Sequence, residues 1–110
     1  MYRFFWTIAL NEPVKPESGA AFTDHWHTGS EILQEYPGAL GTHLHPMRDT
    51  PGSFILMAEW ESEEARDAMS VDATYGDSER AQRWRALPPN ESFGAIVGFA
   101  GTEIEVVMPA

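Results

Sequence analysis

The stretch of sequence that decides the fold is GTHLHPMRDTPGSFILMAEWE, residues 41–61. It contains two strand-like runs, residues 41–47 and 53–61, separated by the segment Arg-Asp-Thr-Pro-Gly. Proline followed by glycine is typical of a tight turn, because proline presets one backbone angle and glycine tolerates a positive φ. The stretch therefore predicts a β-hairpin in the middle of the chain.

On each side of this hairpin, the sequence carries a helical pattern. Before it, apolar residues between Phe22 and Tyr36 recur at spacings of three and four, which predicts a helix over residues 20–36 after a loop over residues 11–19. After it, Ser62 and Ser78 are good helix N-caps, and each precedes a short helical pattern. A break is expected between these two patterns at residues 74–77.

The two ends of the chain are expected to form strands. Residues 2–10 are aromatic and β-branched, residues 93–100 are largely apolar, and the alternation over residues 102–108 predicts either an edge strand or an extension of the last strand. The resulting order, β-α-β-β-α-β, is that of a ferredoxin-like α+β fold with a four-stranded antiparallel sheet and helices on one face. We expect residues 1–110 to form one domain.

The second face of this sheet also needs a cover. The strand over residues 2–10 is apolar on both faces, so water on one side would leave apolar surface exposed. A second copy of the chain is the simplest cover, and the sequence therefore predicts a symmetric homodimer.

Composition excludes several classes of protein. Acidic residues outnumber basic ones by 17 to 7, so nucleic acid and anionic membranes would repel the chain. Eight of the acids lie in residues 59–79, with a single basic residue among them, and this region is expected to be a solvated outer face. The absence of cysteine excludes disulfides and thiolate catalysis. No apolar run is long enough to span a membrane, and the N-terminal run reads as a strand and not as a signal peptide, so a cytoplasmic location is expected.

Three of the four histidines are candidate catalytic residues. His43 and His45 are two residues apart on an expected strand and so project from one face, and His25 lies in the preceding helix. A neutral imidazole in a pocket serves as a base near pH 7. The same three side chains are also compatible with a divalent metal site, or with plain polar surface positions.

Four aromatic residues are candidates for binding a substrate: Phe22, Trp26, Tyr36 and Trp60. A flat aromatic compound stacks well on such rings, although a small core needs aromatic bulk too. Around Trp84, three arginines are either an anion site or counter-charges for the acidic stretch before them. No phosphate-binding loop, nucleotide fingerprint or nucleophile elbow is present.

Two motifs carry a resemblance to a known family. The helix over residues 20–36 ends in Tyr-Pro-Gly-Ala-Leu-Gly, and the hairpin leads into Ala-Glu-Trp-Glu-Ser-Glu-Glu-Ala at residues 58–65. This arrangement resembles the antibiotic biosynthesis monooxygenase family of the dimeric α/β barrel superfamily, over about residues 2–107. Trp60 matches a family position.

The resemblance implies a homodimer with a pocket between sheet and helices in each subunit. Members of the family oxidise polycyclic phenols to quinones without metal or flavin: the substrate anion itself reduces oxygen, and the protein supplies orientation, desolvation and a proton acceptor. No cofactor is therefore expected. Other members degrade heme, but residues 2–10 contain no asparagine and no histidine follows His45, as that branch would require.

Three functions remain open from the sequence. The first is cofactor-independent oxidation of a small aromatic or phenolic compound, with a histidine as base and Trp26 as a stacking wall. The second is a non-catalytic small-molecule-binding or stress-associated protein on the same fold. The third is a metal-dependent enzyme that uses the histidine cluster.

Overall fold

The computed structural model describes residues 1–11 and 16–110, with side chains in the second range from Ala20 onward. Part of the loop predicted over residues 11–19 lies outside the described residues, and its end, from Pro16, is helical. The elements follow in the order β1 (Tyr2–Leu10), α1 (Pro16–Leu33), β2 (Ala39–Pro46), β3 (Ser53–Trp60), α2 (Glu63–Tyr75), α3 (Glu79–Ala86), the 3₁₀ helix η1 (Asn90–Ser92) and β4 (Gly94–Thr102).

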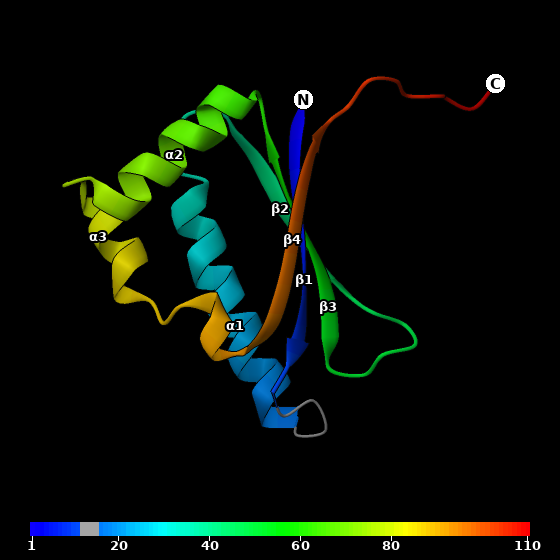
Figure 1. Cartoon of the computed structure of the whole chain (residues 1–110), viewed down its shortest axis with the longest axis vertical. Coiled ribbons are helices and arrows are strands. Elements are labelled where there is room, and N and C mark those ends of the chain that lie inside the picture. The colour runs from blue at the N-terminus through cyan, green and yellow to red at the C-terminus, as the bar shows by residue number, and fades with distance from the viewer. Residues whose placement is uncertain (12–15) are drawn as a thin grey trace.

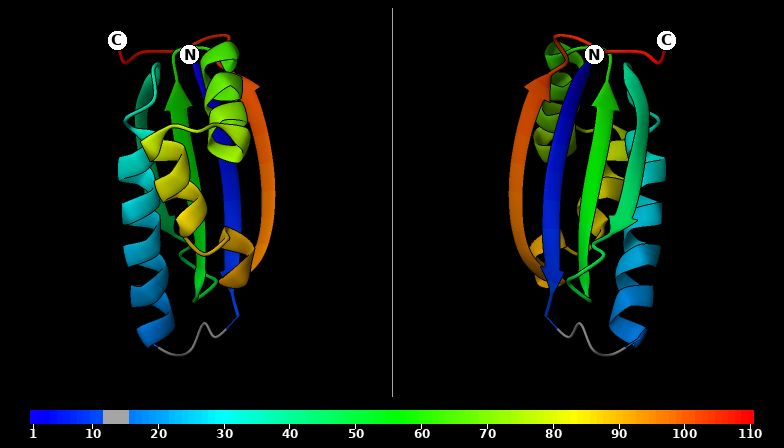
Figure 2. Two further views of the ribbon diagram at one scale, coloured as in Figure 1. Left: turned by 90° about the vertical axis from the view of Figure 1, so that its left-hand side faces the viewer. Right: turned by 90° about the vertical axis from the view of Figure 1, so that its right-hand side faces the viewer.

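The strands form an antiparallel sheet in the order β2-β3-β1-β4. All the described helices lie on one face of it, and the other face is open (Figures 1 and 2). This is the ferredoxin-like α+β arrangement that the sequence predicts. The predicted division of the second helical segment is also present, because α2 ends at Tyr75 and the hydroxyl of Ser78 caps α3 by accepting from the amide of Ala81.

The central hairpin forms as expected. β2 pairs with β3, with Leu44 opposite Leu56 and His45 opposite Ile55. Gly52 has a φ of +82°, a conformation that favours glycine, at the turn before β3. A register shift between Ala39 and Gly41 decides which side chains of β2 face the helices.

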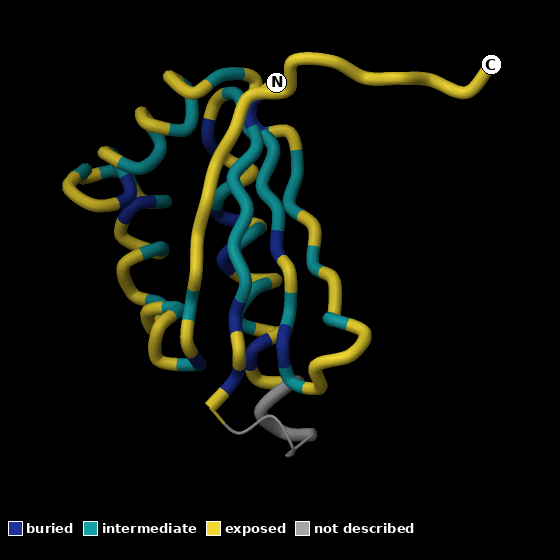
Figure 3. The backbone as a smooth tube through the Cα atoms, turned by 45° about the vertical axis from the view of Figure 1, so that its right-hand side comes forward, coloured by how far each residue is buried: buried dark blue, intermediate teal, exposed yellow. Residues whose placement is uncertain are grey.

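Alternation along the strands sends one set of side chains toward the helices. Ile8 and Leu56 are among the fully buried residues of this layer, and Phe22 packs on them from α1. A second buried cluster joins Tyr36 to Trp60. Buried positions concentrate where the sheet meets the helices, whereas β4 is exposed along most of its length (Figure 3).

Besides the earlier start of α1, the ends of two elements differ from the sequence prediction. The regular part of α1 ends at Leu33, and tight turns carry the chain on to Tyr36. β4 ends at Thr102, so the predicted strand over residues 102–108 is wrong apart from its first residue. Beyond Thr102 the chain leaves the sheet on the side away from the helices (Figure 1), and after one hydrogen bond from the Glu103 amide to the Met1 carbonyl its alternating pattern has no strand to pair with among the described residues.

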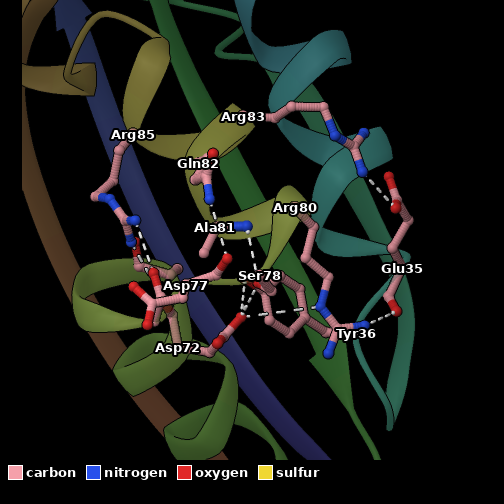
Figure 4. Close-up of polar contacts among 12 residues, drawn as sticks. Glu35, Tyr36, Asp72, Asp77, Ser78, Arg80, Ala81, Gln82, Arg83 and Arg85 are labelled. Carbon is pink, nitrogen blue, oxygen red and sulfur yellow. Dashed lines mark hydrogen bonds and ion pairs between the residues drawn. The ribbon is translucent and has the colours of Figure 1, made fainter.

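The arginines around Trp84 hold α3 in place. Arg80 donates to the backbone carbonyl of Glu35 at 2.8 Å, and Arg83 forms an ion pair with the Glu35 carboxylate at 2.5 Å. Arg85 donates to the carbonyls of Ala73 and Gly76, at the C-terminal end of α2 (Figure 4). The three side chains therefore tie α3 to α2 and to the segment after α1, and this use of their donors argues against an anion site; the carboxylate that Arg83 binds, on Glu35, lies outside the acidic stretch of residues 59–79.

Candidate functional site

A cavity of about 280 Å³ lies between the sheet and the helices. Its walls come from β1, β3 and β4 on the sheet side and from α1, α2, α3 and η1 on the other. The lining residues are Phe4, Trp6, Leu33, Ala58, Trp60, Arg66, Met69, Trp84, Asn90, Glu91, Ile96 and Gly98. We call this space the aromatic cavity, because four of its walls are aromatic rings.

The volume and lining of the aromatic cavity suit a flat apolar compound. Ligand sites are typically concave and apolar, with few polar groups that fix orientation. Here Arg66, Asn90 and Glu91 are the polar members. The sheet helps to keep the space open at Gly98, where an added Cβ would lie 3.4 Å from the ring of Phe4.

Two further spaces adjoin the aromatic cavity. A narrow pocket of about 50 Å³ is lined by His25 and Trp26 of α1, and a wider recess of about 550 Å³ lies beside α3 and η1. Trp84 and Asn90 line all three spaces. These two residues therefore form the partition that separates the aromatic cavity from the two adjoining spaces.

Asn90 is held by His25. The two side chains come from elements 65 residues apart, and His25 Nε2 lies 2.8 Å from Asn90 Oδ1. An amide oxygen only accepts, so Nε2 carries the proton and, in the neutral ring, Nδ1 keeps a free lone pair. The His25 ring also stacks on Phe93 with centroids 4.6 Å apart, which limits its rotation.

The histidines that the sequence analysis grouped together do not form one cluster. His43 and His45 do share a face, with parallel rings 6.4 Å apart, but both are exposed on the open face of the sheet. His43 contacts Glu59 there at 2.9 Å. The reason is strand alternation: Leu44 points into the core toward the helices, so its two neighbours point away from them and from His25.

The four aromatic candidates do not share one site. Trp60 lines the aromatic cavity and Trp26 the narrow pocket. Phe22 is fully buried against Trp6, Phe54 and Phe93, so the structure gives it a packing role.

Tyr36 does not line the aromatic cavity; it lines a recess of about 340 Å³ between the segment that follows α1 and helix α2. Its hydroxyl donates to Asp72 at 2.8 Å, and Ser78 donates to the same carboxylate oxygen at 2.7 Å (Figure 4). Burial, and then the hydrogen bond to Asp72, raises the pKa of Tyr36. The hydrogen bonds from Ser78 and Tyr36 lower the pKa of Asp72. This network links the segment that follows α1 to α2 and to the start of α3, which is a structural role.

Of the twelve residues that line the aromatic cavity, only Trp60 is among the sequence candidates, and the residues that sequence reasoning missed include Phe4, Trp6, Arg66 and Asn90. The aromatic content of residues 2–10 was visible, but both faces of that strand are apolar, and alternation alone does not tell which face the helices cover. Asn90 stands directly after two prolines that end a helical pattern, which is a weak signal for a site.

Among the described residues, no group of three or more His, Asp or Glu side chains is arranged to hold a metal ion. The metal hypothesis needs His25, His43 and His45 together, but His25 lies on the helix side of the sheet and the other two lie on its open face. Nor is any helix in the described part of the chain long and apolar enough to cross a bilayer.

The fold and the cavity together define a ferredoxin-like α+β protein with an aromatic-walled cavity between its sheet and its helices. The family model of antibiotic biosynthesis monooxygenases matches residues 7–75. That match covers more than half of the chain, so the chain belongs to the antibiotic biosynthesis monooxygenase family. No curated protein matches the sequence.

Solved structures share the fold at low sequence identity. SnoaB, a cofactor-independent oxygenase from Streptomyces nogalater, superposes with a TM-score of 0.64 at 20% identity, over 96% of this chain and 95% of its own. Rv0793 from Mycobacterium tuberculosis superposes with a TM-score of 0.68 at 12% identity, over 97% and 98%. A conserved protein from Methanosarcina mazei gives 0.68 at 13% identity, over 94% and 92%.

Proposed function

We propose that this chain is a cofactor-independent oxygenase that oxidises a small aromatic or phenolic compound in the aromatic cavity. The single observation that carries the proposal is the cavity itself, a space of about 280 Å³ walled by Phe4, Trp6, Trp60 and Trp84. Membership of the monooxygenase family supports the reaction class. The cofactor-independent chemistry named for SnoaB supports the absence of a resident cofactor.

The reaction uses the electrons of the substrate. A phenol with a free ring position loses its proton, and the resulting anion transfers electrons to dioxygen. A carbon–oxygen bond forms at that ring position, the oxygen–oxygen bond then breaks, and one oxygen atom stays as a quinone carbonyl while the other leaves as water. The balance is phenol plus dioxygen to quinone plus water, so the protein needs to supply only orientation, desolvation and proton transfer.

His25 is the proton acceptor in this proposal. It lines the narrow pocket next to the aromatic cavity, and its hydrogen bond to Asn90 leaves Nδ1 free to take a proton. Asn90 uses its oxygen toward His25, so its NH₂ group remains available to donate to a substrate oxygen.

A homodimer is part of the same proposal. On the open face, Phe5 and Phe99 stack at 5.5 Å, and Ile55, Val97 and Phe99 are exposed. A second copy covering this face would bury those side chains. Phe99→Glu should convert the dimer to a monomer in sedimentation velocity, whereas Tyr75→Glu, at an exposed position of α2, should not.

The test of the activity is oxygen consumption with a panel of phenols, using metal-chelated protein. We expect consumption of one dioxygen per quinone formed. His25→Gln should lower kcat at least about tenfold, since a positioned general base contributes roughly 10²–10⁴-fold. His27→Gln is the matched control, because His27 is exposed on the same helix and pairs with Glu31.

Ligand binding without oxygen consumption would contradict the oxygenase proposal. Thermal shifts with phenols, equal in air and under nitrogen, would then favour the non-catalytic binding protein instead. Activity that survives His25→Gln would refute only the assigned proton acceptor.

A further inference from the structure

Arg66 is the one cation among the described residues that line the aromatic cavity. It lies in the first part of α2, and its guanidinium carbon sits 4.6 Å from the centre of the Phe4 ring. The Arg66 side chain is 28% exposed, so it is partly withdrawn from water. A cation in such surroundings interacts more strongly with a nearby anion than one on an open surface.

The hydrogen-bonding capacity of Arg66 is unused within the described part of the protein. Its nearest carboxylate, on Asp67, is 3.8 Å away, which is beyond hydrogen-bond distance. Glu91 also lines the cavity but forms no ion pair with Arg66 in the described structure. The contact with Phe4 uses the face of a ring, so the five N–H donors of the guanidinium remain available to a ligand.

The contrast with the other arginines supports a role for Arg66 in binding. Arg80, Arg83 and Arg85 each donate to a carbonyl or carboxylate of the protein. Arg66 shows no such protein partner. Moreover, a chain with a net charge of −10 repels anions, so an anionic compound needs a local cation to enter the cavity.

We propose that Arg66 makes the aromatic cavity selective for ring compounds that carry an anionic oxygen, with the ring between the aromatic walls and the oxygen on the guanidinium. This inference rests on the proposed function for the location of the ligand, and it narrows the substrate class. An ionised phenol and an arenecarboxylate present the same chemistry, a planar ring with one negative oxygen group. For a phenol, Arg66 would also favour the ionised form that reduces oxygen.

The test is a binding experiment under nitrogen, so that oxidation does not interfere. Three probes distinguish the kinds of anionic group. The first is 4-nitrophenol, whose phenolate is visible by absorbance; the second is the carboxylate benzoate; and the third is nitrobenzene, the neutral control. Bound to the wild-type protein, 4-nitrophenol should ionise with a pKa about one unit below that of the free compound, which corresponds to about tenfold tighter binding of the phenolate. Benzoate should bind more tightly than nitrobenzene.

The informative variant is Arg66→Gln, with Arg48→Gln as the control for loss of one positive charge at an exposed site outside the cavity. Arg66→Gln should abolish the pKa shift of the phenol and weaken benzoate about tenfold, while nitrobenzene binding changes less than twofold. Arg48→Gln should behave like wild type. If Arg66→Gln does not fold, added salt on the wild-type protein provides the same comparison, because it should weaken benzoate and not nitrobenzene.

Equal affinity of the wild-type protein for charged and neutral probes, or unchanged anion binding in a folded Arg66→Gln variant, would overturn this inference and leave the oxygenase proposal standing. Failure of the oxygenase proposal looks different: the probes would bind as described here, yet no phenol would consume oxygen. A response to benzoate without a response to 4-nitrophenol would overturn the part of the inference that concerns phenol ionisation.

Discussion

Replacing Phe22 tests whether this side chain belongs to the core or to the ligand site. Phe22 is fully buried, with ring centroids 6.4 Å from Trp6, 5.4 Å from Phe54 and 5.8 Å from Phe93. Phe22→Ala leaves a cavity among these rings and should lower the free energy of unfolding by about 3–5 kcal/mol. Phe22→Leu keeps most of the volume but loses ring contacts, each worth about 0.5–1.5 kcal/mol, and should cost about 1–2 kcal/mol.

The assay is urea unfolding followed by tryptophan fluorescence and circular dichroism, at one fixed protein concentration because a dimer adds to apparent stability. Val71→Ala, at an exposed position of α2, is the control and should change stability by less than about 0.5 kcal/mol. Binding of 4-nitrophenol to Phe22→Leu should match wild type. The reasoning is refuted if Phe22→Ala costs less than about 1 kcal/mol, or if Phe22→Leu keeps its stability and loses the ligand.

Three further changes test local features of the fold. Gly38→Ala should destabilise the protein by at least about 1 kcal/mol by urea unfolding, with Val71→Ala again as the control, because Gly38 has a φ of +84° and an added Cβ would lie 2.6 Å from a side-chain carbon of α2. Asp72→Asn should reduce the loss of stability on acidification: the hydrogen bond from Ser78 lowers the folded-state pKa of Asp72, so its stabilising effect is present above the unfolded value of about 3.9 and disappears as the pH falls through the lower folded-state pKa. A wild-type unfolding curve no more sensitive to acid than that of Asp72→Asn would contradict this. Ser62→Ala removes the cap of α2 and should cost about 1 kcal/mol by urea unfolding, with Ser62→Asp retaining most of the stability.

The elements themselves could be predicted because their signals are local. The turn at Gly52 and the caps at Ser62 and Ser78 depend on residues within a few positions along the chain, and each lies where the sequence indicates. The alternation after Thr102 is equally local, yet it did not produce a strand, because a strand also needs a partner and residues 103–110 leave the sheet. Family membership, too, follows from motifs that the printed sequence contains.

The composition of the candidate site was decided only by the tertiary structure. Sequence spacing shows that His43 and His45 share a face, but the shift in register between Ala39 and Gly41 and the placement of the helices turn that face away from His25. Conversely, the contact between His25 and Asn90 spans 65 residues, and no periodicity in the chain encodes it. Local patterns thus determined the elements and their order, because backbone preferences act over a few residues. The cavity, its cation Arg66 and its partition at Asn90 arise from packing between distant elements, which only the folded chain brings together.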